Sequence, residues 1–285
     1  MKKRKLFSFC VEEQFIQSKT GRLDTCEDLI HIGENFVAVI DGTTSKTDEK
    51  WNQRTGGQLA AKTINECFEQ MPAHYSALQA AHLFTSEIDK LYKSLNVFES
   101  VKKGTTQRFT ATLVALSMPR GEVWLIGDCQ YRLKNEIFKR PKRADEVLAN
   151  VRALFLETEL LRGATMEELL KDERGHQFVR FLLERQTIFQ NNLSAGEYWY
   201  PAVDGFPIPP KGISVRKIPK DVTDLVLATD GYPILRRNLK ETETSLEQLL
   251  RRDPLLFREY KSTKGMLAGN VSFDDRAFVR LRLRR

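Results

Sequence analysis

The chain has 285 residues, of which 41% are hydrophobic and 29% are charged, so it can bury the core of one large or two modest domains. This composition excludes a disordered chain. The longest apolar runs, such as 36–40 and 225–228, are far shorter than the roughly 20 residues of a transmembrane helix, so we expect no membrane span.

The net charge of +7 is concentrated at the two ends of the chain. Eight of the 45 Lys and Arg residues lie near the termini: Lys2, Lys3, Arg4, Lys5, Arg280, Arg282, Arg284 and Arg285. The remaining 37 basic residues nearly balance the 38 Asp and Glu residues, so the rest of the chain is close to neutral. The arginines after 275 alternate with apolar residues, which indicates a strand with one solvated face. We therefore do not expect nucleic acid to be a partner, and nothing in the pattern indicates an oligomeric state.

The N-terminus is basic but does not resemble a complete signal peptide. The apolar residues after Lys5 give way to Glu12 and Glu13 before an apolar region of adequate length has formed, so we expect a cytoplasmic protein. The four cysteines, at 10, 26, 67 and 129, form no C-x-x-C pair. We expect reduced thiols rather than a disulfide framework or a zinc site.

Short β-rich runs bounded by Gly, Pro, Asp or Asn recur along the chain and predict a sheet-dominated core. They are residues 35–41, 109–117, 122–127, 130–134, 213–218, 224–229 and 276–283. The turns at 118–121 and 127–129 separate three successive runs, which favours an antiparallel meander.

Apolar residues at helical spacing follow Gly56-Gly57 and continue from Phe84 to Leu95, which predicts two consecutive helices against a sheet. Between about 143 and 205 the pattern predicts a helical insertion, with a capping box at 165–168. Residues 245–248 are a second candidate capping box. Because no linker divides the chain, we expect a single domain, 1–285, that carries this insertion.

Acidic residues follow or precede strands at five places. They are Glu27-Asp28, Asp41-Gly42, Asp128, Asp230-Gly231 and Asp274-Asp275. Any one of them is typical of a turn, but carboxylates gathered at one end of a sheet would repel one another unless a cation neutralised them. Oxygen ligands without convergent Cys or His favour Mg²⁺ or Mn²⁺. Two such ions about 3.5–4 Å apart can activate a bridging water for phosphoester hydrolysis.

In order along the chain, these motifs resemble the protein phosphatase 2C (PPM) family of metal-dependent phosphatases. The resemblance runs from about residue 20 to 283 and rests on Glu27-Asp28, 38–42, 56–61, 110–114, 126–133, 227–231 and 274–279. It implies an α+β fold, an α-β-β-α sandwich of two antiparallel sheets flanked by helix pairs. It also implies a serine/threonine phosphatase that hydrolyses phosphorylated proteins by attack of a metal-bridging water.

Site roles follow from the same resemblance. Asp41 would bridge two ions, of which one is completed by Glu27 and the carbonyl of Gly42 and the other by Asp230 and Asp274. Asp128, with Asp230, matches the position of a third ion. Asp28 would orient metal-bound water.

The sequence departs from the family in ways that keep other functions open. Thr43 stands where many members have a histidine, a candidate general acid. Arg22 stands one residue from the expected phosphate-binding arginine, so it either takes that role by a shift in register or is a solvated arginine after Gly21. Asp275 stands where Asn is usual and could form only a turn. A pseudophosphatase that acts as a binding module, or a phosphatase for a small metabolite, therefore remains possible.

Two further features near the acids are interpreted as structural. Cys26 and Cys129 adjoin acidic residues, but no His or Lys partner is indicated, so we expect buried thiols rather than nucleophiles. Asp204, in a second Asp-Gly pair within the insertion, is interpreted as a turn residue.

Overall fold

The computed structural model describes residues 8–44 and 49–284, and in it ten strands form two five-stranded antiparallel sheets. The basic residues 2–5, Arg285 and residues 45–48 of the loop after Thr44 lie outside the described residues. Within the described part, no helix combines the length and the apolar character needed to cross a membrane.

The first sheet has the strand order β2-β3-β4-β5-β8 and the second β1-β10-β9-β6-β7. Their bounds are β2 Leu29–Ile32, β3 Phe36–Gly42, β4 Ala111–Ser117, β5 Glu122–Ile126 and β8 Ile213–Lys217. Those of the second sheet are β1 Ser8–Gln17, β10 Arg276–Arg284, β9 Asp224–Ala228, β6 Gln130–Leu133 and β7 Glu136–Lys139.

Strand β3 shows how the sandwich forms, because both of its faces are buried. Val37 and Val39 pack between the two sheets, whereas Phe36, Ala38 and Ile40 face the helices. This alternation follows from the period of two in a strand. Each fully buried Phe or Ile contributes about 1.5–3 kcal/mol relative to an exposed one.

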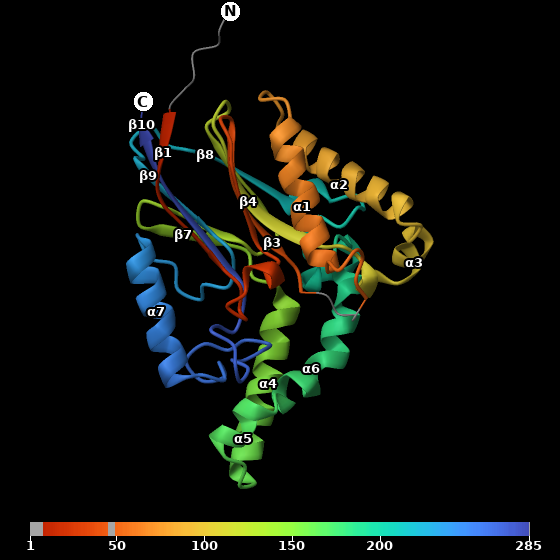
Figure 1. The fold of residues 1–285 in the computed structure, drawn as a ribbon, viewed down its shortest axis with the longest axis vertical. Coiled ribbons are helices and arrows are strands. Elements are labelled where there is room, and N and C mark those ends of the chain that lie inside the picture. The colour runs from red at the N-terminus through yellow and green to blue at the C-terminus, as the bar shows by residue number, and fades with distance from the viewer. Residues whose placement is uncertain (1–7, 45–48, 285) are drawn as a thin grey trace, which may run out of the picture.

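Helices cover the outer faces of both sheets (Figure 1). α1 (Gly56–Gln70) and α2 (Ala77–Ser94) pack on the first sheet, followed by the short α3 (Phe98–Lys103). α7 (Leu239–Arg252) packs on the second sheet with apolar residues of the segment 253–273. The predicted α-β-β-α sandwich is therefore confirmed, although one helix and a loop segment, rather than a helix pair, cover the second sheet in the described part of the chain.

The segment 143–205 is helical, as predicted, and lies at one end of the sandwich (Figure 1). It contains α4 (Arg143–Leu161), α5 (Met166–Lys171), α6 (Arg174–Arg185) and the 3₁₀ turns Gln186–Phe189 and Leu193–Tyr198. The predicted capping box at Thr165 is present. The buried Arg152 of α4 donates to the carbonyl oxygens of Leu255, Leu256 and Ser262, which ties this segment to the loop after α7.

Two predictions about local structure are wrong. Strands β4 and β5 form a hairpin, but β6 belongs to the other sheet, so 127–129 is a crossover rather than a meander turn. The helix expected to begin at Ser245 begins several residues earlier, where the Asn238 side chain accepts a hydrogen bond from the backbone N–H of Glu241. An N-cap asparagine satisfies a free N–H group as well as serine does, so the expected capping box lies inside the helix.

Candidate metal centre

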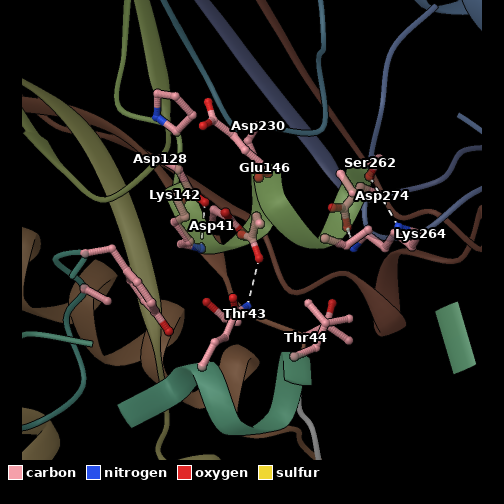
Figure 2. Close-up of a pocket in the computed structure, with 18 of the residues that line it drawn as sticks. Asp41, Thr43, Thr44, Asp128, Lys142, Glu146, Asp230, Ser262, Lys264 and Asp274 are labelled. Atoms are coloured by element: carbon pink, nitrogen blue, oxygen red, sulfur yellow. Dashed lines mark hydrogen bonds and ion pairs between the residues drawn. The ribbon is translucent and has the colours of Figure 1, made fainter. Parts of the chain in front are cut away.

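Four of the predicted ligands, Asp41, Asp128, Asp230 and Asp274, line one cavity of about 240 Å³ at the end of the sandwich (Figure 2). Asp41 belongs to β3 and Asp128 follows β5 in the first sheet, while Asp230 follows β9 and Asp274 precedes β10 in the second. The cavity therefore lies where strand ends of both sheets meet, as the sequence predicted for these acids.

Strand register and one glycine place Asp41 and Asp128 together. Asp41 pairs with Thr112 across β3 and β4. The Thr112 hydroxyl lies 3.0 Å from Oδ1 of Asp128 and 3.3 Å from Oδ2 of Asp41. Gly127 has φ +91°, and a Cβ there would overlap the Thr112 side chain, so only glycine allows the turn that brings Asp128 to this position.

Asp41, Asp128 and Asp230 each offer a carboxylate oxygen, and the three oxygens lie within 4.8 Å of one another. Nearby, Oδ2 of the buried Asp28 has no hydrogen-bond partner. A buried polar oxygen without a partner is costly, and a divalent cation or its water would satisfy it. The donors are all oxygens, which suits Mg²⁺ or Mn²⁺. The residues therefore fit a hard divalent ion.

The pKa values of these acids reflect their mutual repulsion. Burial, together with neighbouring carboxylates, raises the pKa of Asp28, Asp41 and Asp230 well above the usual value of a carboxyl group. Burial alone would also raise the pKa of Asp274, but Lys264 and Lys19 reverse the effect and hold it below its ordinary value. Ionising all of these acids together is therefore unfavourable without a cation, and bound divalent ions would offset that cost.

Asp230 should make the metal-free protein less stable as the pH rises. A carboxyl group with a higher pKa in the folded chain binds its proton more tightly there, so this contribution to stability is lost above the unfolded pKa of about 3.9. We expect the melting temperature of metal-free Asp230→Asn to match that of the wild type near about pH 4 and to exceed it increasingly toward about pH 7. Thermal unfolding of both proteins across this pH range tests the prediction. A difference in melting temperature that does not grow with pH would contradict a raised pKa for Asp230.

Glu27 and Gly42 lie side by side at the edge of this site. A Cβ on Gly42 would overlap the backbone oxygen of Glu27, so the two segments are in direct contact. The Glu27 carboxylate accepts a 2.6 Å hydrogen bond from the Thr55 hydroxyl and lies 3.6 Å from Nζ of Lys19. These two residues are not among the cavity-lining residues, so their ligand role remains a prediction.

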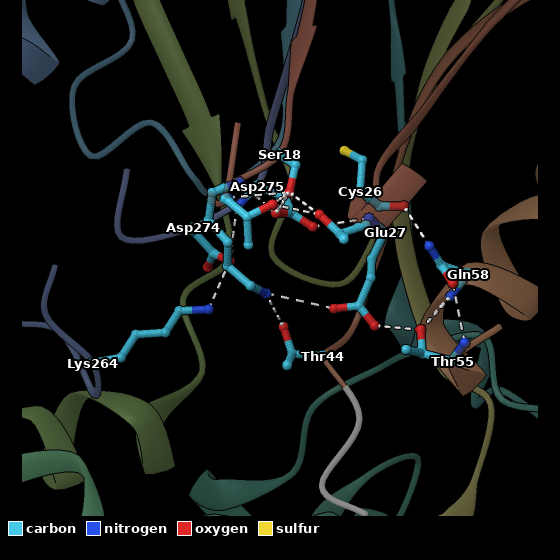
Figure 3. A network of polar contacts seen from close by, with 12 residues as sticks. Ser18, Cys26, Glu27, Thr44, Thr55, Gln58, Lys264, Asp274 and Asp275 are labelled. Atoms are coloured by element: carbon cyan, nitrogen blue, oxygen red, sulfur yellow. Dashed lines mark hydrogen bonds and ion pairs between the residues drawn. The ribbon is translucent and has the colours of Figure 1, made fainter. Parts of the chain in front are cut away.

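Asp275 does more than form the turn considered for it. Its carboxylate accepts hydrogen bonds from the backbone N–H of Lys19 and of Glu27, both at 2.8 Å, and from the Ser18 hydroxyl at 3.2 Å (Figure 3). It therefore joins the end of β1, the Glu27-Asp28 segment and the start of β10. Ser18 and Asp275 are 257 residues apart in the sequence, so no local sequence pattern could predict that they are in contact.

Lysines pair with the acids, which the sequence did not predict. Nζ of Lys142 lies 2.6 Å from Oδ2 of Asp128, and Nζ of Lys264 lies 2.6 Å from Oδ1 of Asp274 (Figures 2 and 3). Burial lowers the pKa of Lys142, but Asp128 and Asp145 outweigh it and leave the pKa above the ordinary value. Burial likewise lowers the pKa of Lys264, and Asp274 more than reverses this effect, so both side chains are ammonium ions at neutral pH.

Arg22, the candidate for phosphate binding, is not brought to the acids. Its side chain is 73% exposed and forms a 2.6 Å ion pair with Asp24. Thr43 does line the cavity, and no histidine is found among the described residues that line it. The thiols are poor nucleophiles, because burial raises the pKa of Cys26 to about 12 and that of Cys129 well above its usual value.

Asp204 is a buried ion-pair residue that contacts two residues of the cavity wall, so it does more than form the turn expected for it. It accepts a 3.1 Å bond from the backbone N–H of Phe206, as in a turn. It also pairs with Arg108 at 2.8 Å and accepts from the side chains of Gln190 and Asn191. Both Arg108 and Gln190 line the cavity.

No family model matches the chain, and no curated protein matches it in sequence. Solved structures match nearly its whole length. The catalytic domain of the serine threonine protein phosphatase PstP in complex with 2 manganese ions has a TM-score of 0.50 at 13% identity and covers 98% of this chain and 100% of its own.

Two further structures are similar at lower TM-scores. The serine/threonine phosphatase PstP/Ppp of Mycobacterium tuberculosis has 16% identity and a TM-score of 0.49, with 98% of this chain and 100% of that chain covered. Stp1 of Staphylococcus aureus has 13% identity and a TM-score of 0.46, with 99% of each chain covered. Together with the two sheets and their helices, the match to the manganese-bound PstP domain shows that this chain has the protein phosphatase 2C fold.

Proposed function

We propose that the protein is a Mg²⁺- or Mn²⁺-dependent phosphatase that hydrolyses phosphoserine and phosphothreonine on proteins. The observation that carries this proposal is the group of Asp41, Asp128 and Asp230, whose oxygens lie within 4.8 Å of one another in a cavity at the strand ends. The similarity to a serine/threonine phosphatase domain solved with 2 manganese ions supports it.

In this proposal Asp41, Asp230 and Asp274 would hold one ion, Glu27 and the Gly42 carbonyl would hold a second together with Asp41, and Asp128 would contribute to a third position. When bound, the ions would activate water for attack on phosphorus and stabilise the charge on the phosphoryl oxygens. Thr112 keeps Asp41 and Asp128 aligned through its hydroxyl. Asp28 has an unpartnered oxygen and is suited to orient water by accepting its proton in a hydrogen bond.

The decisive experiment is hydrolysis of p-nitrophenyl phosphate and of phosphopeptides with EDTA, with Mn²⁺ and with Mg²⁺. We expect activity that depends on a divalent ion and is lost with EDTA. Hydrolysis that is unaffected by EDTA would contradict the proposal.

A pseudophosphatase is the second candidate, because Lys142 and Lys264 already neutralise two of the acids and Arg22 faces solvent. A protein of this kind would bind phosphoproteins without turnover. The same assay separates the two, since a pseudophosphatase would hydrolyse no phosphoester under any of these conditions. Turnover of small phosphorylated metabolites but not of phosphopeptides would instead favour a metabolite phosphatase.

The segment 143–205 should set the choice of substrate, because Glu146 of α4 lines the cavity with a side chain that is 46% exposed. Reversing this charge in Glu146→Lys should shift the preference toward phosphopeptides with acidic flanks by up to about fivefold in kcat/KM, equivalent to ~1 kcal/mol. Turnover of p-nitrophenyl phosphate should change little, since a small ester makes few contacts outside the metal site.

A matched control is Glu157→Lys on the same helix, where the glutamate pairs with Arg258 and is not among the cavity-lining residues. It should leave the peptide preference unchanged. An equal effect of Glu146→Lys on all substrates would indicate damage to the site rather than selectivity.

A further inference from the structure

Among the described residues, no arginine pairs with an aspartate of the candidate metal centre. Arg22 is exposed and paired with Asp24. Arg108 lines the cavity, but its guanidinium is anchored to Asp204, to the carbonyl oxygen of Val101 and over the Phe206 ring, and not to an aspartate of the metal centre. The cations that do contact these aspartates are therefore the first candidates to recognise the phosphoryl oxygens of a phosphoester.

Two lysines occupy suitable positions. Lys142 is the N-cap residue of α4, its side chain is 14% exposed, and it contacts Asp128. Lys264 comes from the loop after α7, its side chain is 26% exposed, and it contacts Asp274. Both line the cavity together with the four aspartates, as Figure 2 shows.

Both lysines are held in place by the surrounding structure. Lys142 also lies over the Tyr200 ring, with Nζ 5.2 Å from its centroid. The loop of Lys264 is fixed by the Glu173 carboxylate, which accepts from the backbone N–H of Gly265, and by the buried Arg152, which donates to Ser262. Side chains that are positioned before the ligand arrives lose less entropy on binding it.

We propose that Lys142 and Lys264 bind the phosphoryl oxygens of the substrate from two sides of the metal centre, in the role that Arg22 cannot take. This inference rests on the proposed phosphatase function and names the residues that would recognise its substrate.

The ion pairs with aspartate do not prevent this role. An ammonium group has three N–H donors, so a lysine that gives one to a carboxylate retains two for a phosphate. Divalent ions bound by the same aspartates would take over much of the neutralisation of their charge. Each lysine would then make a charge-assisted hydrogen bond to the substrate.

The test compares Lys142→Met and Lys264→Met with Lys261→Met, a matched control. Lys261 lines the same cavity, but its Nζ bonds to Asn150 rather than to an acid of the site. The Mn²⁺ affinity of each protein, the affinity of the Mn²⁺-loaded protein for inorganic phosphate and the KM for a phosphopeptide are measured. Thermal unfolding with Mn²⁺ verifies that each variant is folded.

We expect the phosphate affinity to fall at least about tenfold in each of the two test variants, with a matching rise in KM, and to stay unchanged in Lys261→Met. Mn²⁺ affinity should stay the same or increase, because a competing positive charge has been removed. Lys142→Arg and Lys264→Arg should recover part of the phosphate affinity, since they restore a charged donor.

Phosphate affinity that is unchanged in both folded variants, in a protein whose wild type hydrolyses phosphoesters, would overturn this inference and leave the phosphatase function intact. The lysines would then only neutralise the aspartates. A wild type that binds Mn²⁺ but neither binds phosphate nor hydrolyses esters would instead overturn the proposed function, and this inference with it.

Discussion

Replacing Asp41 by Asn should reduce metal-dependent phosphoester hydrolysis by a hundredfold or more, on the order of 3 kcal/mol in the activation barrier. The substitution keeps the size of the side chain but removes the negative charge proposed to hold two cations. Burial and the carboxylates of Asp28, Asp128 and Asp274 raise the pKa of Asp41, so the metal-free variant should be as stable as the wild type or more stable. Steady-state rates with saturating Mn²⁺ and melting temperatures without metal measure the two effects.

Asp145→Asn is a suitable control for this experiment. Asp145 also lines the cavity, but it accepts a 2.8 Å hydrogen bond from Gln186, which an asparagine oxygen can still accept. It should retain activity within a few-fold. If Asp41→Asn keeps most of the wild-type rate, the metal-bridging role of Asp41 is wrong and the reacting group must be bound elsewhere.

The fold could be predicted from sequence where the signals are local. Buried strands such as β3, β4 and β9 have apolar runs that end at Gly, Asp or Ser, and α1 and α2 repeat apolar residues at helical spacing. The strands β1 and β7 were missed because each lies at a sheet edge, where exposed polar residues interrupt the apolar pattern. The four-residue edge strand β2 was also missed. The assignment of β6 to the second sheet depends on tertiary packing that no local pattern encodes.

The residues of the candidate site also fall into those that a local sequence pattern predicts and those that it does not. Asp41, Asp128, Asp230 and Asp274 could be predicted because each stands in a short motif at a strand end, and the order of these motifs resembles a known family. Lys142 and Lys264 could not, because their neighbours in sequence give no reason to place them beside aspartates. For Arg22 the sequence left two interpretations open, and its exposed pair with Asp24 agrees with the solvated one.

Asp204→Ala should destabilise the protein strongly, by about 3–5 kcal/mol. The carboxylate of Asp204 is completely buried, and four donors converge on it: the guanidinium of Arg108, the side-chain amides of Gln190 and Asn191, and the backbone N–H of Phe206. Removing it leaves the positive charge of Arg108, whose side chain is only 12% exposed, without its partner. For a chain of this size the melting temperature should fall by about 5–15 °C.

Asp24→Ala provides the matched comparison, because Asp24 also pairs with an arginine but on the surface, where its side chain is 65% exposed. Exposed pairs contribute little to stability, so the melting temperature of Asp24→Ala should stay within a few degrees of the wild type. Because Arg108 and Gln190 line the cavity, Asp204→Ala should also lower activity at temperatures where the variant is still folded. A melting temperature close to that of the wild type would show that Asp204 forms no buried ion pair, and that the wall of the cavity is held by other contacts.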